Sequence, residues 1–406
     1  MKVLMVTDHF HPDMSSGGRL WTDLAEELVR GGHRVHVLTS HSQYNTDAIA
    51  PRAEVYRGIS IRRLRLPATA RRGLLARALN ELLFSMVAFV ATLRVRRPDV
   101  VLSLSSPPFL PPFMAVASRV RRVPFVYVNY DVFPDIAVAM GVLKPGTPTV
   151  WAFERSLRFA LRRATRLVVI GRCMEGVVRA KLGGAATPID VIHNWSDSTQ
   201  FFPLPRTKNA FFEREPGLRD AFIVQYSGNM GRFQDFESIL AAAERLQDER
   251  RVRFVLIGDG ARREWILDEV ERRGLRNVAV LPFQPQAVLN ESLNAADVSL
   301  VSLERGAEGL GVPSKFYPVL AVGKPVLALM QSHGEVARIV AEHGIGRVVD
   351  QGDVDGLCDA ISALMSEDDE RRRMGERARD VFVERFDKHV AVREYVRTLE
   401  AAVTRL

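Results

Sequence analysis

Two cations stand in glycine-rich segments of the second half of the chain and could together hold a diphosphate. Arg232 ends the segment Ser227–Arg232, and Lys315 follows Ser314 in residues 304–317, a segment with three glycines. Backbone N–H groups and a guanidinium can share the charge of a phosphate. A lysine at the start of a helix is unfavourable unless an anion lies between its ammonium group and the helix N-terminus. The pattern predicts a phosphate site; a glycine-rich turn with a surface arginine is the structural alternative.

Three carboxylates occupy segments where they could act on a hydroxyl group. Asp131 and Asp135 come directly after an apolar run at residues 124–128, and Glu308 shares the glycine-rich segment of Lys315. A carboxylate in such a place can serve as a general base or can clamp an acceptor hydroxyl. For Asp131 and Asp135 the alternative is capping of the next helix. We expect Glu308 to accept hydrogen bonds from sugar hydroxyls beside a bound phosphate.

The first loop of the chain, residues 8–18, is long and ends in Gly17 and Gly18 at the start of a helix. It is too long for the tight glycine turn of a dinucleotide fingerprint, which disfavours NAD and FAD. Glycines at a helix N-terminus suit an approaching anion. His9 and His11 have no suitably spaced third ligand, so they are interpreted as solvent-facing. No metal and no resident cofactor are expected.

These segments belong to a βα rhythm that occurs twice. Apolar runs of strand length alternate with helical patterns, which is typical of parallel sheets covered by helices. The expected α/β fold has two doubly wound, Rossmann-like domains facing a cleft, with ligands beyond the carboxyl ends of the strands. We predict an N-terminal domain at 1–202, a proline-rich linker at 203–217, a C-terminal domain at 218–387 and a final helix at about 388–406. The expected strands are 3–7, 35–39, 59–66, 100–104, 124–128, 167–170, 189–192, 222–226, 254–257, 278–281, 298–302, 326–329 and 347–349.

The composition is that of a globular protein, with 406 residues, 47% of them hydrophobic, and a formal net charge of +8. The excess of arginine has two alternative explanations. One is a GC-rich genome, and the other is attraction of the protein to phosphates or to an anionic membrane. Basic runs are not interleaved with aromatic residues, so nucleic acid is not an expected partner. The two cysteines and the start of the chain, which lacks a cleavable signal pattern, indicate a cytoplasmic protein.

An apolar stretch at residues 82–93 could contact a membrane. Arginines flank it on both sides, at positions 71, 72, 77, 94, 96 and 97, and a proline-rich apolar segment at 107–114, read as a loop, follows. The stretch is too short to span a bilayer. A helix with basic flanks can lie in the headgroup region instead. The alternative is a helix packed in the N-terminal core.

In this order and spacing the motifs resemble those of a known family. The chain is similar to family 4 glycosyltransferases of the GT-B fold, and most of all to the WbuB-like bacterial surface-polysaccharide transferases. The similarity runs through nearly the whole chain. The matching pieces are Gly17–Arg19, Gly32–His33, Asp99–Val101, Ser105–Pro108, Asp131–Asp135, Val191–Trp195, Ser227–Asn229, Gly258–Gly260 and Gly311–Lys315.

The resemblance implies a retaining, metal-independent transfer of a hexosyl or N-acetylhexosaminyl group from a nucleotide-diphosphate sugar, UDP-linked by expectation. The acceptor would be a glycan or a polyprenyl-diphosphate-linked lipid, at the inner face of the membrane, in surface-polysaccharide (O-antigen) or glycolipid synthesis. Asp131 and Glu308 would be catalytic. The diphosphate would lie on Gly18, Arg232, Ser314 and Lys315; the sugar and nucleotide on Gly228, Asn229, Pro282, Phe283, Gly311, Val312 and Pro313; and the acceptor on Asp135 and Ser106.

Two positions depart from the family pattern. A second glutamate of the family usually contacts the ribose, and Pro318 stands in its place. A family lysine a few residues after the arginine is also missing, and residues 234–237 occupy that stretch. Two other functions stay open: a GT-B sugar-nucleotide epimerase and a non-catalytic ligand-binding protein.

Overall fold

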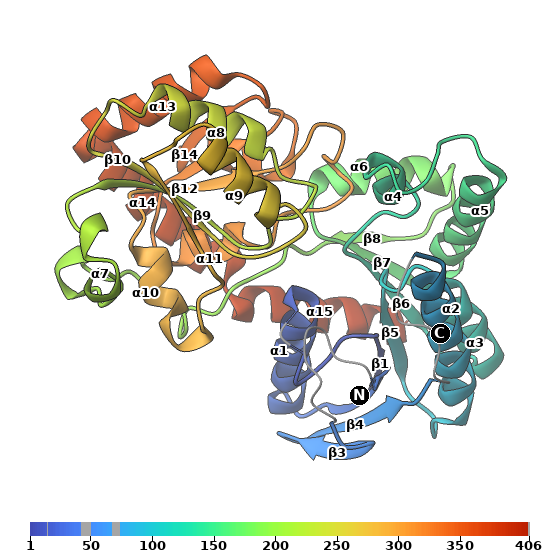
Figure 1. The fold of residues 1–406 in the computed structure, drawn as a ribbon. Helices are drawn as coiled ribbons and strands as arrows, with labels where there is room; N and C mark the ends of the chain where they lie inside the picture. Colours follow the sequence, from blue (N-terminus) through green and yellow to red (C-terminus); the bar gives the residue numbers. More distant parts are fainter. Residues whose placement is uncertain (14, 42–49, 67–73, 405–406) are drawn as a thin grey trace. The chain divides into compact units, whose positions relative to one another are not determined.

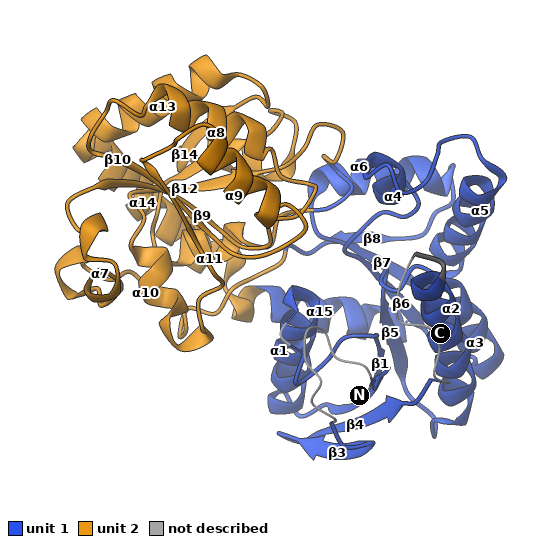
Figure 2. Ribbon diagram, in the orientation of Figure 1, with its two compact units in different colours: residues 1–193, 309–311, 391–406 blue, residues 194–308, 312–390 orange. Residues whose placement is uncertain are grey.

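A computed structural model describes residues 1–13, 15–41, 50–66 and 74–404 (Figure 1). The chain divides into two compact units (Figure 2). Unit 1 comprises residues 1–193, 309–311 and 391–406, and unit 2 comprises residues 194–308 and 312–390. Each unit is built on one sheet.

The sheet of unit 1 has eight strands in the order β3-β4-β2-β1-β5-β6-β7-β8. All pairs are parallel except the β3–β4 hairpin. The strands are β1 (Lys2–Val6), β2 (Arg34–Ser40), β3 (Ala53–Tyr56), β4 (Ile59–Leu64), β5 (Val100–Leu104), β6 (Phe125–Asn129), β7 (Arg166–Val169) and β8 (Ile189–Val191). The helices are α1 (Ser16–Arg30), α2 (Leu74–Arg94), α3 (Leu110–Arg121), α4 (Asp135–Ala139), α5 (Pro148–Arg163), α6 (Arg172–Leu182) and, from Ala391 on, α15 (Lys388–Val403).

The sheet of unit 2 has six parallel strands in the order β11-β10-β9-β12-β13-β14. They are β9 (Phe222–Ser227), β10 (Val252–Ile257), β11 (Val278–Leu281), β12 (Val298–Ser302), β13 (Val326–Leu329) and β14 (Gly346–Val349). The helices are α7 (Phe211–Arg214), α8 (Phe236–Arg245), α9 (Arg263–Arg272), α10 (Leu289–Asn294), α11 (Phe316–Ala321), α12 (Glu335–His343), α13 (Val354–Ser366) and α14 (Asp368–Val381), which continues into a π-helical turn at Phe382–Phe386.

The central strands form because their apolar runs are buried on both faces. Every residue of β5, β6 and β12 is buried, as is usual for parallel strands covered by helices. The fold class and the strand rhythm predicted from the sequence are therefore confirmed. The hairpin strand β3 was not predicted.

The segment at 203–217, predicted as a linker, packs within unit 2 instead. It contains two 3-10 turns and α7, and both Phe211 and Phe212 are fully buried in a cluster with Ile223 and Val255. Burying two phenylalanines stabilises this segment on its own sheet. The units change at residues 193 and 194 rather than at 202.

The proline-rich stretch at 107–114 was interpreted as a loop, and this interpretation is wrong for residues 110–114. Helix α3 begins at Leu110 and carries Pro111 and Pro112 in its first turn. Proline is tolerated there because the first N–H groups of a helix have no partner within the helix.

Candidate active site

Several donor-side residues predicted in unit 2 follow the two strands between which the strand order of its sheet reverses. Strands β9 and β12 are parallel neighbours, although β10 and β11 follow β9 on one side and β13 and β14 follow β12 on the other. Ligands of doubly wound sheets bind beyond the carboxyl ends of strands at such a point. The segment after β9 holds Gly228 and Asn229, and the segment after β12 leads to Glu308 and Lys315.

Lys315 is the best-defined group of this site. Its Nζ donates a hydrogen bond to the Tyr226 hydroxyl and lies 3.8 Å from the centroid of that ring. Its side chain passes Gly228, where a Cβ would lie 3.0 Å from Lys315 Cε. Burial lowers the pKa of Lys315 to about 7. Among the described residues no carboxylate forms an ion pair with this lysine, and a bound anion would favour its protonated form.

Glycine is required where the ends of β9 and β10 approach each other. Gly258 has φ +151°, and a Cβ there would lie 1.9 Å from the Gly228 carbonyl oxygen. The Tyr226 hydroxyl donates to the Asn229 carbonyl oxygen at 2.5 Å, which fixes the turn beside Lys315. The backbone turn after β9 is thus fixed in place next to Lys315.

Arg232 and Glu308 complete the polar groups on this edge. Arg232 is exposed, and no described residue forms an ion pair with it. Glu308 Oε2 accepts the Gly306 N–H at 2.7 Å, and Oε1 accepts Gln351 Nε2 at 3.0 Å. Gln351, from the segment after β14, positions the carboxylate and was not predicted from the sequence.

The other predicted donor residues differ in their surroundings. Pro282 and Phe283 follow β11, and the Phe283 ring is 53% exposed. Val312 packs against the apolar core around Phe316, whereas Pro313 and Ser314 are partly buried. Helix α11 starts at Phe316, with Lys315 at its N-cap position.

In the sheet of unit 1 the strand order reverses between β1 and β5, and the acceptor-side residues follow β5 and its neighbour β6. Asp131 follows β6, the neighbour of β5, and its own N–H and that of Tyr130 both donate to Ser105 Oγ at 3.1 Å. Burial raises the pKa of Asp131 to about 6. A carboxylate that titrates near neutral pH suits a general base. Ser105, which fixes this loop, was part of a matching motif but was given no role of its own; the predicted acceptor residue Ser106 is partly buried beside it.

Asp131 and Gly311 lie together in unit 1. The Val132 N–H donates to the Leu310 carbonyl oxygen at 3.0 Å, and a Cβ at Gly311 would lie 3.3 Å from Asp131 Oδ1. A side chain at position 311 would therefore press on the carboxylate. Two residues that the sequence predicted in different roles, catalytic and donor-binding, are neighbours.

Asp135 does not cap a helix. It is the first residue of α4 after the N-cap Pro134, and its Oδ2 lies 2.7 Å from Lys181 Nζ. The same lysine pairs with Glu154 at 2.8 Å. This ion pair already engages the Asp135 carboxylate.

In the first loop, Gly17 is more open than Gly18. Ser15 caps α1 by accepting the Gly18 N–H at 3.2 Å, and a Cβ at Gly18 would lie 3.1 Å from the Asp13 carbonyl oxygen. For Gly17, no atom of the described residues lies within 4 Å of the corresponding position. An approach of a ligand to the backbone is easier at Gly17.

His9 is not the solvent-facing loop residue that was expected. Its Nδ1 lies 2.7 Å from Asp13 Oδ2, and its Nε2 lies 3.4 Å from Asp8 Oδ2. Burial opposes charge on the imidazole, but the two carboxylates raise the pKa of His9 overall. Burial also acts against the charge of Asp13, yet hydrogen bonds from His9 and Ser15 lower its pKa to about 2. The i, i+4 spacing of His9 and Asp13 after a strand could have indicated this pair.

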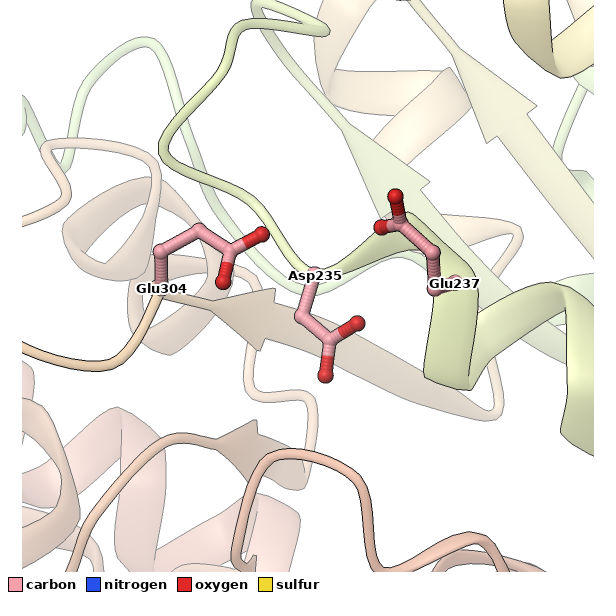
Figure 3. Close-up of side chains that lie close together, drawn as sticks. All are labelled: Asp235, Glu237 and Glu304. Carbon is pink, nitrogen blue, oxygen red and sulfur yellow. The ribbon is translucent and has the colours of Figure 1, made fainter. Parts of the chain in front are cut away.

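Three carboxylates cluster in unit 2 and could in principle hold a cation: Asp235, Glu237 and Glu304 (Figure 3). Asp235 caps α8 by accepting the Ser238 N–H at 3.0 Å. Glu237 pairs with Arg262. Burial first, and then the two neighbouring carboxylates, raise the pKa of Glu304. Two members of the cluster thus already have structural partners.

Family models match both halves of the chain. A glycosyl transferase 4-like domain matches residues 17–195, and a glycosyl transferases group 1 domain matches residues 208–381. The probable glycosyltransferase WbjE of Pseudomonas aeruginosa is 32% identical over 350 residues, covering 85% of this chain and 84% of WbjE. The chain belongs to the family 4 glycosyltransferases.

Other relatives agree with this assignment. The transferase is 26% identical over 376 residues to the putative colanic acid biosynthesis glycosyl transferase WcaI of Escherichia coli, covering 89% and 91% of the two chains. Its fold is that of Anabaena HepE, solved in complex with UDP, with a TM-score of 0.73, 16% identity and coverage of 99% and 100%. The GT-B fold is confirmed.

Proposed function

We propose that this glycosyltransferase moves a sugar from a UDP-sugar to a glycan or lipid-linked acceptor, with retention of anomeric configuration, in the synthesis of a bacterial surface polysaccharide. The observation that carries the proposal is Lys315, a desolvated lysine without a carboxylate partner among the described residues, between Tyr226 and Gly228. HepE binds UDP, and the name of WcaI places that relative in colanic acid synthesis.

In the proposed reaction the bond between the anomeric carbon and the β-phosphate oxygen breaks, and a bond to the acceptor oxygen forms. Lys315, Arg232 and the backbone N–H groups of the glycine-rich segments stabilise the charge that develops on the leaving diphosphate. Glu308 holds hydroxyl groups of the donor sugar. Asp131 takes the acceptor proton, since a carboxylate with a pKa of about 6 is largely ionised at neutral pH.

We further propose that the transfer needs no metal ion. Cationic side chains can take the role that a divalent ion has at a leaving phosphate. Asp235 and Glu237 already serve as a helix cap and an ion-pair partner.

Product analysis tests this function. The protein is incubated with a panel of UDP-sugars, with and without a bacterial lipid extract, and the products are identified by mass spectrometry and by the anomeric coupling in proton NMR. We expect an α-linked glycoside from an α-linked donor, formed only with acceptor. Free epimerised donor in the absence of acceptor would identify an epimerase, and tight UDP binding without any turnover would identify a binding protein.

A further inference from the structure

Helices α2, α3 and α5 form one layer on a single face of the sheet of unit 1. They connect β4 to β5, β5 to β6 and β6 to β7, so all three crossovers run in the same direction across the sheet. Right-handed crossovers that run in one direction lie on the same face. Figure 2 shows the three helices together on one side of the strands, with α2 packed beside α3 and α3 beside α5. Their outward sides therefore share one surface, called here the helical surface.

The α2 and α3 parts of the helical surface are apolar. On α2, Leu79, Met86 and Val90 are exposed along one stripe at spacings of seven and four residues. On α3, Val116 and Val120 are exposed one turn apart, and Val120 is 64% exposed. The two helices that carry these stripes pack together, and the rings of Phe89 and Phe113 lie 5.9 Å apart between them. Exposed apolar side chains that gather on neighbouring helices are typical of an interaction surface.

On α5, aromatic rings and arginines alternate along one side. Trp151, Arg155, Phe159 and Arg163 follow one another at intervals of four residues, and Trp151 is 67% exposed. The Arg155 guanidinium lies 5.8 Å from the Trp151 ring centroid, and that of Arg163 lies 5.9 Å from the Phe159 ring centroid. An aromatic ring beside a long cationic side chain is suited to the boundary between hydrocarbon and headgroups.

The charge of these helices is strongly one-sided. Their described sequence holds eight arginines and two glutamates, Glu81 and Glu154. Both glutamates are neutralised locally: Glu81 pairs with Arg77 at 3.0 Å, and Glu154 pairs with Lys181 at 2.8 Å. The helical surface is therefore apolar and cationic at once, which complements an anionic lipid layer.

We propose that the helical surface docks on a bilayer of anionic phospholipid, with Trp151 and Phe159 inserted at headgroup depth and the arginines on phosphates. Among the described residues, Ala76–Arg94 of α2 is the one segment long and apolar enough to cross a membrane, and 28% of it is buried. However, α2 connects two strands of one sheet and buries Phe84, Ala88 and Ala91. In the proposed docking, α2 therefore lies along the bilayer surface, with its exposed apolar side toward the lipid. The flanking Arg71 and Arg72 lie outside the described residues.

Flotation of the full chain with vesicles tests the proposal independently of turnover. Vesicles of phosphatidylcholine are compared with vesicles of equal parts phosphatidylcholine and phosphatidylglycerol, at low and high salt. We expect binding to the anionic vesicles that weakens with salt. Because each arginine near an anionic surface contributes to binding, R155E/R163E should lower the partition coefficient about tenfold or more. W151S/F159S should lower it while the remaining binding stays salt-dependent.

Matched variants on unit 2 serve as controls. R250E/R276E reverses two exposed arginines, and F202S removes a phenylalanine as exposed as Phe159. Both should bind vesicles as the parent does, and circular dichroism checks that all variants are folded. Absence of binding to anionic vesicles at low salt overturns the proposal, as does equal binding to both vesicle types. A lipid-free dimer that W151S/F159S dissociates would make the helical surface an interface between copies, which also overturns it.

Discussion

Lys315 and Tyr226 are joined by a hydrogen bond from Nζ to the phenolic hydroxyl and by a cation–π contact of 3.8 Å. The tyrosine is buried and its pKa is raised, so it stays neutral and does not balance the charge of the lysine. The Tyr226 hydroxyl in turn donates a hydrogen bond to the Asn229 carbonyl oxygen. The pair holds the Lys315 amine in place at the end of β9 without a counter-charge, so a bound anion would favour its protonated form.

Removing this cation should weaken nucleotide binding. K315M keeps most of the side-chain volume, and loss of a charge-assisted hydrogen bond costs about 1.5–3 kcal/mol, or roughly tenfold or more in affinity. Isothermal titration with UDP measures the effect, and K208M, at an exposed lysine, is the control. Equal affinity of K315M and the parent would remove Lys315 from the diphosphate site.

The same lysine predicts how stability changes with pH in the absence of nucleotide. Its pKa is about 7 in the folded protein against an ordinary value of 10.5, so between these values the unfolded chain binds more protons. The free energy of unfolding should therefore rise with pH over this window. Denaturant titrations at several pH values should show a smaller slope for K315M than for the parent. Lys324, whose pKa burial lowers to about 8, accounts for a remaining slope. An unchanged slope in K315M would show that Lys315 is charged in the free protein.

Replacing the proposed base should lower turnover and alter its pH profile. The side-chain amide introduced by D131N cannot take up a proton as the carboxylate does, and general base catalysis contributes about 10²–10⁴-fold. In the parent, kcat/KM should fall as pH drops below about 6, because the Asp131 carboxylate becomes protonated. The variant should lack this acidic limb, whereas D220N, at an exposed aspartate, should keep it. An acidic limb retained in D131N would assign the proton transfer to another group.

The three-carboxylate cluster should be dispensable for catalysis. EDTA is expected to leave the rate unchanged, and E304Q should retain activity because Glu304 carries no proposed role. D235A should instead lower the free energy of unfolding by about 0.5–2 kcal/mol, since Asp235 caps α8. Loss of activity in both E304Q and EDTA, restored by Mg²⁺ or Mn²⁺, would show that the cluster binds a catalytic metal.

Much of the fold follows from local sequence. Central parallel strands such as β5 and β6 are uninterrupted apolar runs, so their places could be predicted. The β3 strand could not, because its four residues alternate between exposed and partly buried positions at the sheet edge. The two phenylalanines of α7 are buried by tertiary packing, whereas the prolines around them favour a linker.

The sequence indicated which chain segments form the site, but not which side chains contact one another there. Glycine-rich stretches after strands indicated Gly228 and Lys315, yet Tyr226, 89 residues before Lys315, looks like an ordinary strand residue. Ser105 and Gln351 likewise act through hydrogen bonds to distant chain segments, Ser105 to the Asp131 loop and Gln351 to Glu308. Such partners depend on how the strands are ordered in the sheet, which the local pattern does not encode.

Transfer of a labelled sugar tests the central claim most directly. UDP-sugars carrying a radiolabel in the sugar are incubated with the protein and a bacterial lipid extract, and label in the organic phase is counted for the parent, K315M and E308Q. The account predicts that one UDP-sugar of the panel labels the acceptor with the parent, and that E308Q lowers the rate without the loss of UDP affinity expected for K315M. No acceptor labelling from any UDP-sugar, or equal labelling by all three proteins, would contradict it.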